Sequence, residues 1–224
     1  MAAPPVLLIH GFGSSFEHGW RHPGWADLLK ESGRRVIGVD LLGHGGAEKP
    51  HDPAAYADVE ARVAATIAAE DQVDVVGFSA GAGVALRLLA GDPDGFRRGA
   101  VLGVGNGLLK APEPNKIAAA LERGVDPEDV DSVVFQRLAE QPGNDREALV
   151  AFLRRATKPL TLDDLARITC PVLVVIGDRD FSFPADQLAA AIGDSRLVTL
   201  RGVDHFATTT EFRAMEAVLS FLDA

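Results

Sequence analysis

The stretch that decides the fold is VDVVGFSAGAGVALRLLA, residues 73–90. It contains the pattern G-x-S-x-G at residues 77–81, preceded by an apolar run and followed by helical spacing. This setting predicts a strand, a tight turn and a helix, with Ser79 exposed on the turn at the helix N-terminus. Small flanking residues keep such a turn narrow, and the helix dipole favours a developing negative charge there. We interpret Ser79 as a nucleophile; the alternative is a glycine-rich turn with an incidental serine.

Further short apolar runs, each bounded by Gly, Pro or Asp, accompany the run at 73–78. Continuous runs without alternation are typical of strands buried on both faces of a parallel sheet. Helical patterns at 25–32, 54–69, 81–90, 185–192 and 211–222 lie between them and favour an α/β sheet with helices on both faces. We expect Arg97 and Arg98 to follow a helix and to be solvated. The other expected strands are Val6–His10, Arg35–Asp40, Ala100–Val104, Pro171–Gly177 and Arg196–Leu200.

One long segment interrupts this alternation. Between Gly105 and Thr169 the sequence predicts no strand, only short helices at 117–123, 130–140, 146–157 and 162–168. We therefore expect a core formed by residues 1–105 and 170–224, with residues 106–169 inserted as a helical cap.

Composition excludes several classes of function. The chain has 224 residues and a net charge of −10, from 32 acidic and 22 basic residues. Such a field repels phosphate backbones and anionic membranes, so we expect neither a nucleic acid nor a membrane as partner. A single cysteine forms no internal disulfide, and no zinc-site spacing is present. The N-terminal stretch lacks the features of a signal peptide, so we expect a cytoplasmic protein.

The segment His10-Gly11-Phe12-Gly13 directly follows the first expected strand. A loop there can direct the Phe12 backbone N–H toward the space above Ser79, and the Ala80 N–H would supply the second donor of an oxyanion hole. We interpret His10 as a structural residue that holds this loop rather than as a catalytic base.

Two later segments supply a candidate acid and base. Gly177-Asp178-Arg179-Asp180 ends a strongly apolar strand, and the segment around His205 follows the last strand. Either aspartate could orient a histidine; we favour Asp180 and interpret Asp178 as a turn former. Ser79, Asp180 and His205 occur in the chain order Ser…Asp…His, which differs from the two common protease orders.

These motifs together resemble the α/β-hydrolase superfamily over nearly the whole chain. The segments that carry the resemblance are HGFG at 10–13, DLLGHG at 40–45, GFSAG at 77–81, GDRDFSFP at 177–184 and GVDHF at 202–206. The resemblance implies the α/β-hydrolase fold and places the acid at the last position of G-x-x-D, which is Asp180. It also implies that Asp40 and His44 belong to a structural loop.

The sequence departs from the family pattern in two ways. Only five residues precede Val6, so the first two strands of the family are expected to be missing, leaving about six parallel strands. A partner subunit would then cover the exposed edge strand, and we expect a monomer or a homodimer. The expected cap is short, which favours an open site and a modest substrate.

The serine argues against haloalkane dehalogenases and epoxide hydrolases, relatives that have aspartate at this position. We expect a serine hydrolase of small to medium carboxylic esters that forms an acyl-enzyme and needs no cofactor. Thioesterase, lactonase, C–C hydrolase and cofactor-free perhydrolase chemistry remain alternatives on the same triad, as does a ligand-sensing receptor with little turnover. Candidate pocket residues are Trp20, Leu108, Phe135 and Phe181.

Overall fold

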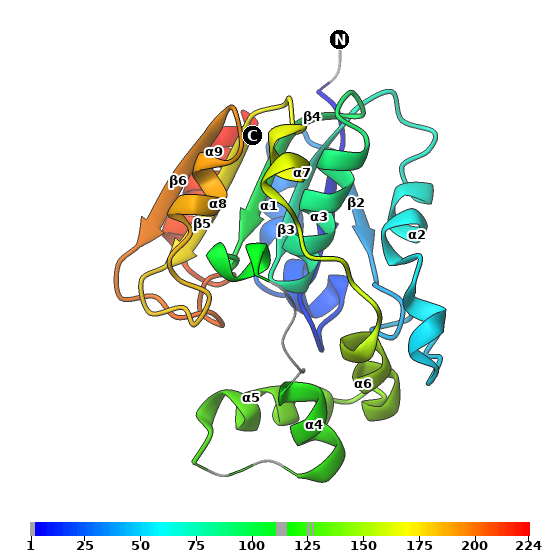
Figure 1. Cartoon of the computed structure of the whole chain (residues 1–224). Helices are drawn as coiled ribbons and strands as arrows, with labels where there is room; N and C mark the ends of the chain where they lie inside the picture. The colour runs from blue at the N-terminus through cyan, green and yellow to red at the C-terminus, as the bar shows by residue number, and fades with distance from the viewer. Residues whose placement is uncertain (1–2, 111–115, 125, 127) are drawn as a thin grey trace.

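The computed structural model describes residues 3–110, 116–124, 126 and 128–224, and it contains one parallel sheet (Figure 1). Its six strands lie in the order β2-β1-β3-β4-β5-β6, and every neighbouring pair is parallel. The α/β architecture expected from the sequence is therefore confirmed. The strands are β1 (Val6–Ile9), β2 (Val36–Val39), β3 (Val73–Phe78), β4 (Phe96–Leu102), β5 (Val172–Gly177) and β6 (Ser195–Leu200).

The strands β1 and β5 are apolar along their length, because both of their faces are covered. In β1, Leu7 and Ile9 enter the core on one face, whereas Val6 and Leu8 enter the core on the other. Successive side chains of a strand point to opposite faces, so both faces must be apolar when both are covered. This explains why the sequence shows continuous apolar runs instead of alternation.

Helices cover both faces of the sheet (Figure 1). One face packs against α1 (Trp25–Glu31) and α9 (Phe212–Leu222). The other packs against α2 (Val59–Ala65), α3 (Ala80–Gly91), α7 (Leu162–Ala166) and α8 (Asp186–Ala190). Single turns η1 (Glu17–Arg21), η2 (Pro53–Tyr56) and η3 (Asn106–Leu109) lie in the connections. Within the described ranges, no helix is both long enough and apolar enough to cross a membrane.

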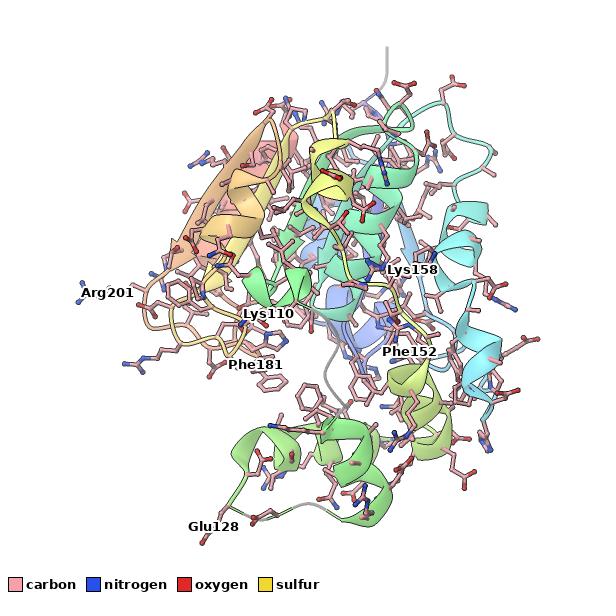
Figure 2. The ribbon with its side chains drawn as sticks, in the orientation of Figure 1. Lys110, Glu128, Phe152, Lys158, Phe181 and Arg201 are labelled. Carbon is pink, nitrogen blue, oxygen red and sulfur yellow. The ribbon has the colours of Figure 1, made fainter. Side chains whose placement is uncertain are left out.

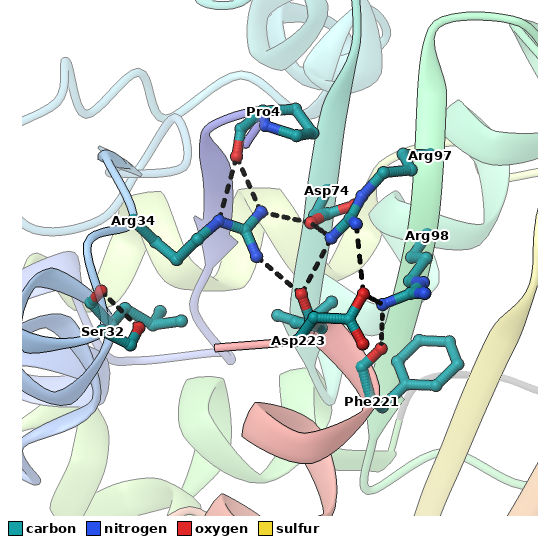
Figure 3. Close-up of polar contacts among 10 residues, drawn as sticks. Pro4, Ser32, Arg34, Asp74, Arg97, Arg98, Phe221 and Asp223 are labelled. Atoms are coloured by element: carbon teal, nitrogen blue, oxygen red, sulfur yellow. Dashed lines mark hydrogen bonds and ion pairs between the residues drawn. The ribbon is translucent and has the colours of Figure 1, made fainter. Parts of the chain in front are cut away.

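The start of β4 corrects one expectation from the sequence. The strand begins at Phe96, and it includes Arg97 and Arg98, which we expected to be solvated. Arg97 donates hydrogen bonds of 2.9 and 2.6 Å to Asp74, a carboxylate in β3 that is fully buried (Figure 3). Arg34 also pairs with Asp74 and donates to the Leu222 carbonyl at 2.7 Å. Arg34 and Arg97 therefore compensate the charge of a buried carboxylate and satisfy its hydrogen bonds. Local sequence patterns do not reveal such a role.

Three helices lie apart from the sheet and its covering layers: α4 (Lys116–Arg123), α5 (Val130–Ala139) and α6 (Arg146–Arg154) (Figure 1). The helix α4 contacts both α5 and α6, and α6 contacts η2. In contrast, α7 packs against α3, and its Leu165 is buried in the core. The assignment of residues 106–169 as a cap stays a proposal, and within it α4–α6 are the helices that stand off the sheet.

Candidate active site

Ser79 occupies a strained turn between β3 and α3. Its φ of 52° and ψ of −114° lie in a region that residues other than glycine rarely adopt. A Cβ atom at Gly77 would lie 2.5 Å from the Gly81 carbonyl oxygen, and one at Gly81 would lie 2.2 Å from the Ile9 carbonyl oxygen. Both contacts are to backbone, which cannot move aside cheaply. The tight turn therefore requires glycine at both positions of the G-x-S-x-G pattern.

The structure brings Ser79, His205 and Asp180 together in a hydrogen-bonded row. His205 Nε2 lies 2.9 Å from Ser79 Oγ, and His205 Nδ1 lies 3.0 and 2.9 Å from the two carboxylate oxygens of Asp180. An ionised carboxylate only accepts hydrogen bonds, so the proton of a neutral imidazole resides on Nδ1. This leaves Nε2 free to accept the hydroxyl proton of Ser79.

Burial and ring contacts fix the orientation of the histidine. His205 is 3% exposed and Asp180 is 5% exposed. The His205 ring lies between Phe78 and Phe181, with centroid distances of 5.0 and 4.2 Å. Asp180 Oδ1 also accepts a hydrogen bond of 2.7 Å from the Ser182 N–H. A hydrogen bond shielded from water in this way is stronger than one in solvent.

Contacts between the loops that follow β5 and β6 hold Asp180 and His205 in position relative to each other. The Arg179 N–H donates to the Val203 carbonyl at 3.1 Å, and the Gly202 N–H donates to Asp178 Oδ1 at 2.6 Å. Asp178 therefore joins the two loops and does not contact His205. This placement agrees with its interpretation as a turn former.

Two backbone N–H groups beside Ser79 have no acceptor within the described part of the chain. They belong to Phe12, in the loop after β1, and to Ala80, the first residue of α3. Phe12, Ser79 and Ala80 line the same cavity. Free donors of this kind can donate hydrogen bonds to a developing oxyanion.

His10 and Asp40 hold the surrounding loops. His10 is fully buried; its Nδ1 donates to the Gly11 carbonyl at 2.7 Å, and its Nε2 accepts from the Leu41 N–H at 3.0 Å. Burial lowers the pKa of His10, which keeps the ring neutral. Both ring nitrogens of His10 are therefore engaged with the backbone. Asp40 accepts hydrogen bonds of 2.7 Å from the Phe16 and Gly46 N–H groups.

Two cavities meet at Ser79, and Phe12, Ser79 and Phe135 line both. The larger has a volume of about 340 Å³ and lies against α3, η3 and the helices α4–α6. The smaller has a volume of about 190 Å³, and His205 lines it. Figure 2 shows Phe181 at the edge of the core that faces α4 and α5.

All four candidate pocket residues border these cavities. Leu108 and Phe181 line the larger one, Phe135 lines both, and Trp20 lines the smaller one. Trp20 is fully buried and packs edge-on against Trp25 at a centroid distance of 5.3 Å, so it forms a fixed wall.

The sequence analysis missed three charged residues of the larger cavity, Glu60, Arg87 and Arg155. Arg87 lies seven positions after Ala80 on the same side of α3, and helical spacing from the turn could have pointed to it. No local signal points to Glu60 or Arg155, because they reach the cavity only through the packing of α2 and the end of α6.

Comparison with known proteins gives a family and several relatives. A model of the alpha/beta hydrolase family matches residues 6–218. A 2-hydroxymuconate semialdehyde hydrolase of Pseudomonas sp. (strain CF600) is 36% identical over 104 residues, which are 44% of this chain. The match covers 36% of that protein's length.

Solved structures show the same fold. An esterase from Exiguobacterium antarcticum superimposes with a TM-score of 0.77 at 21% identity, covering 100% of this chain and 94% of the esterase. A bromoperoxidase from Bacillus anthracis has a TM-score of 0.73 at 22% identity, with coverage of 99% and 92%. At these identities the likeness concerns the fold alone.

Proposed function

Because the chain belongs to the alpha/beta hydrolase family, we propose that it is a serine hydrolase that cleaves carboxylic esters of small to medium size. The observation that carries the proposal is the row of hydrogen bonds from Ser79 through His205 to Asp180. The nucleophile, the base and the orienting acid are each within hydrogen-bonding distance of the next, as acyl transfer requires.

The first half of the reaction forms the acyl-enzyme. Ser79 Oγ attacks the ester carbonyl while His205 Nε2 accepts its proton, and the carbonyl oxygen becomes an oxyanion held by the Phe12 and Ala80 N–H groups. The tetrahedral intermediate then breaks its bond to the alcohol oxygen, which takes the proton from His205. The acyl group remains on Ser79, and Asp180 stabilises the transient imidazolium.

The second half uses water in place of the alcohol. His205 Nε2 accepts a proton from water, and the hydroxide oxygen adds to the acyl carbon. Collapse of this second intermediate releases the carboxylic acid and returns the proton to Ser79 Oγ. These steps use only the side chains named and water, so the proposal invokes no cofactor. In this proposal, residues 106–169 are the cap, and its residues Ile117, Phe135 and Leu153 line the larger cavity.

C–C bond hydrolysis is the second candidate, and the alignment with 2-hydroxymuconate semialdehyde hydrolase favours it. The same three side chains would serve a carbon leaving group. Turnover of ordinary esters with a kcat/KM far above that for a vinylogous diketone supports ester hydrolysis, and the reverse ratio supports C–C cleavage.

Labelling with a fluorophosphonate tests the proposal, read by intact mass and peptide mapping on wild type and Ser79→Ala. Turnover of p-nitrophenyl acetate, butyrate and octanoate is measured on the same samples. We expect label on Ser79 and loss of both label and turnover in the variant. A folded protein without label or turnover would refute the proposal and favour a ligand-sensing protein of the same fold.

A further inference from the structure

The larger cavity contains charges that ester hydrolysis itself does not need. Its described lining is mostly apolar but includes Glu60, Arg87 and Arg155. Arg87 Nε lies 3.4 Å from Glu60 Oε1, and Arg87 Nη2 donates to the Lys158 carbonyl at 2.6 Å. Arg87 and Glu60 therefore largely neutralise each other. Two cations against one carboxylate leave one positive charge in excess, in a chain whose net charge is −10.

Arg155 carries this excess charge. Its Nη1 donates to the Phe152 carbonyl at 2.5 Å, and its guanidinium carbon lies 3.7 Å from the centroid of the Phe152 ring. Within the described ranges, no carboxylate forms an ion pair with it, and Glu60 attracts it only from a longer distance. Burial lowers the pKa of Arg155 to about 10, so the group is still a cation at neutral pH.

The guanidinium of Arg155 can still bind an anion that enters the cavity. The residue is partly buried, and the N–H groups that do not bond to Phe152 have no acceptor in the described chain and remain accessible. The contacts with Phe152 hold the fork in place beside the cavity. A planar, positioned guanidinium is suited to bind a carboxylate through two parallel hydrogen bonds.

The mechanism assigns the two cavities to the two halves of the substrate. His205 must deliver a proton to the leaving alcohol, so the alcohol belongs in the smaller cavity, which His205 lines. The acyl chain then extends into the larger cavity, which Arg155 lines.

We propose that Arg155 binds a carboxylate carried by the acyl chain, so that the preferred substrate is a half-ester of a dicarboxylic acid. This inference rests on the proposed ester hydrolysis at Ser79. It makes Arg155 a residue that determines specificity, in contact with a part of the substrate remote from the reacting bond.

The kinetic test compares two esters that differ in one charge: mono-(4-nitrophenyl) adipate and its methyl-capped analogue. The corresponding pimelate and suberate pairs vary the length of the acyl chain between the ester and the carboxylate. We expect wild type to prefer the anionic ester. The ratio of the two kcat/KM values should fall by roughly 10- to 100-fold in Arg155→Met, as expected for loss of hydrogen bonds to a charged group. The control is Arg154→Met, because Arg154 pairs with Glu122 outside the cavity, and the ratio should not change.

A binding test separates this inference from the proposed reaction. Calorimetry on Ser79→Ala measures monomethyl adipate against dimethyl adipate, with and without Arg155→Met. Tighter binding of the monoanion that is lost with Arg155→Met supports the anion site even if Ser79 proves unreactive. Arg155→Lys keeps the charge without the fork and should give an intermediate preference. The inference is overturned if wild type shows no preference for the anion, or if Arg155→Met weakens both ligands equally.

Discussion

His205 Nε2 lies 2.9 Å from Ser79 Oγ, although 126 positions separate the two residues along the chain. Ser79 directly follows β3 inside the sheet, whereas His205 follows the edge strand β6, with β4 and β5 between the two strands. The loop after β6 must therefore extend back across the ends of two strands. Its hydrogen bonds to the loop after β5 direct it along this path.

Asp180→Asn should disable the histidine without unfolding the protein. An amide can donate to Nδ1 and favour the wrong tautomer, in which Nε2 carries the proton and no longer accepts that of Ser79. We expect kcat for p-nitrophenyl butyrate to fall about 10⁴-fold, with near-UV circular dichroism unchanged. Fluorophosphonate labelling should slow in parallel. A loss below about tenfold would show that Asp180 does not orient the base.

Gly81→Ala should damage the turn that carries Ser79. The added Cβ would lie 2.2 Å from the Ile9 carbonyl oxygen and 2.5 Å from that of His10, so β1 and α3 must separate. Because small displacements of a nucleophile are costly, we expect kcat/KM to fall at least about 10²-fold. The control is Gly91→Ala, at the end of the same helix, where nothing lies within 4 Å of the new Cβ. Equal activity in the two variants would contradict this account.

The sequence predicted those features whose cause is local. Each strand is marked by its own apolar run, and the turn at Ser79 is marked by glycines that backbone contacts require. The sequence also selected Ser79, Asp180 and His205, which the structure places in one row, because each follows the end of a strand. Parallel strands bring such ends to one edge of the sheet.

Features that depend on distant packing could not be predicted. Asp74 interrupts the apolar run of β3, and only Arg34 and Arg97, from other elements, explain its burial. The first residues of β4 could not be predicted for the same reason, because two adjacent arginines are typical of a solvent-exposed segment rather than of a strand. The positive charge in the larger cavity could not be predicted either, because the packing of α6 over the core is what places Arg155 in the cavity lining.

Asp74→Asn should be strongly destabilising. Asp74 is fully buried between Arg34 and Arg97, so the substitution removes the carboxylate that pairs with Arg34 and leaves Arg97 the longer ion pair with Asp223, at 3.5 Å (Figure 3). Breaking a buried ion pair by removing one partner costs about 3–5 kcal/mol. Urea unfolding should show this decrease in the free energy of unfolding. Asp27→Asn, which changes an exposed aspartate, should alter it by less than about 0.5 kcal/mol.

His51 should stabilise the attachment of α6 to the core at acidic pH. Its Nε2 lies 3.0 Å from Asp145 and its Nδ1 lies 3.0 Å from Glu147, both at the start of α6. The hydrogen bond to Asp145 raises the pKa of His51 above its unfolded value. A raised pKa gives stability that is complete below about pH 6.5 and is lost as pH rises through the folded-state pKa. His51→Gln should therefore lower Tm slightly at pH 5.5 and leave it unchanged at pH 9. An equal effect at both pH values would contradict the ionic role.

His44 should make the protein sensitive to acid. The ring is fully buried, with Nδ1 donating to the Leu42 carbonyl at 3.1 Å and Nε2 without a partner in the described chain. Burial lowers the pKa of His44 to about 3, whereas the unfolded chain binds a proton near pH 6.5. Between these values the unfolded state holds more protons, so the free energy of unfolding falls as pH falls, by up to about 1.4 kcal/mol per pH unit.

The variant that isolates this contribution is His44→Asn, which keeps a donor near the Leu42 carbonyl but does not titrate. It loses ring packing against Phe152, at a centroid distance of 4.8 Å, so it should be less stable than wild type at pH 8. Below pH 6 the difference should shrink, because only wild type loses the contribution of His44. Urea unfolding at pH 4.5, 5.5, 6.5 and 8 measures both curves. Curves that stay parallel down to pH 4.5 would show that His44 is protonated in the folded protein as readily as in the unfolded chain.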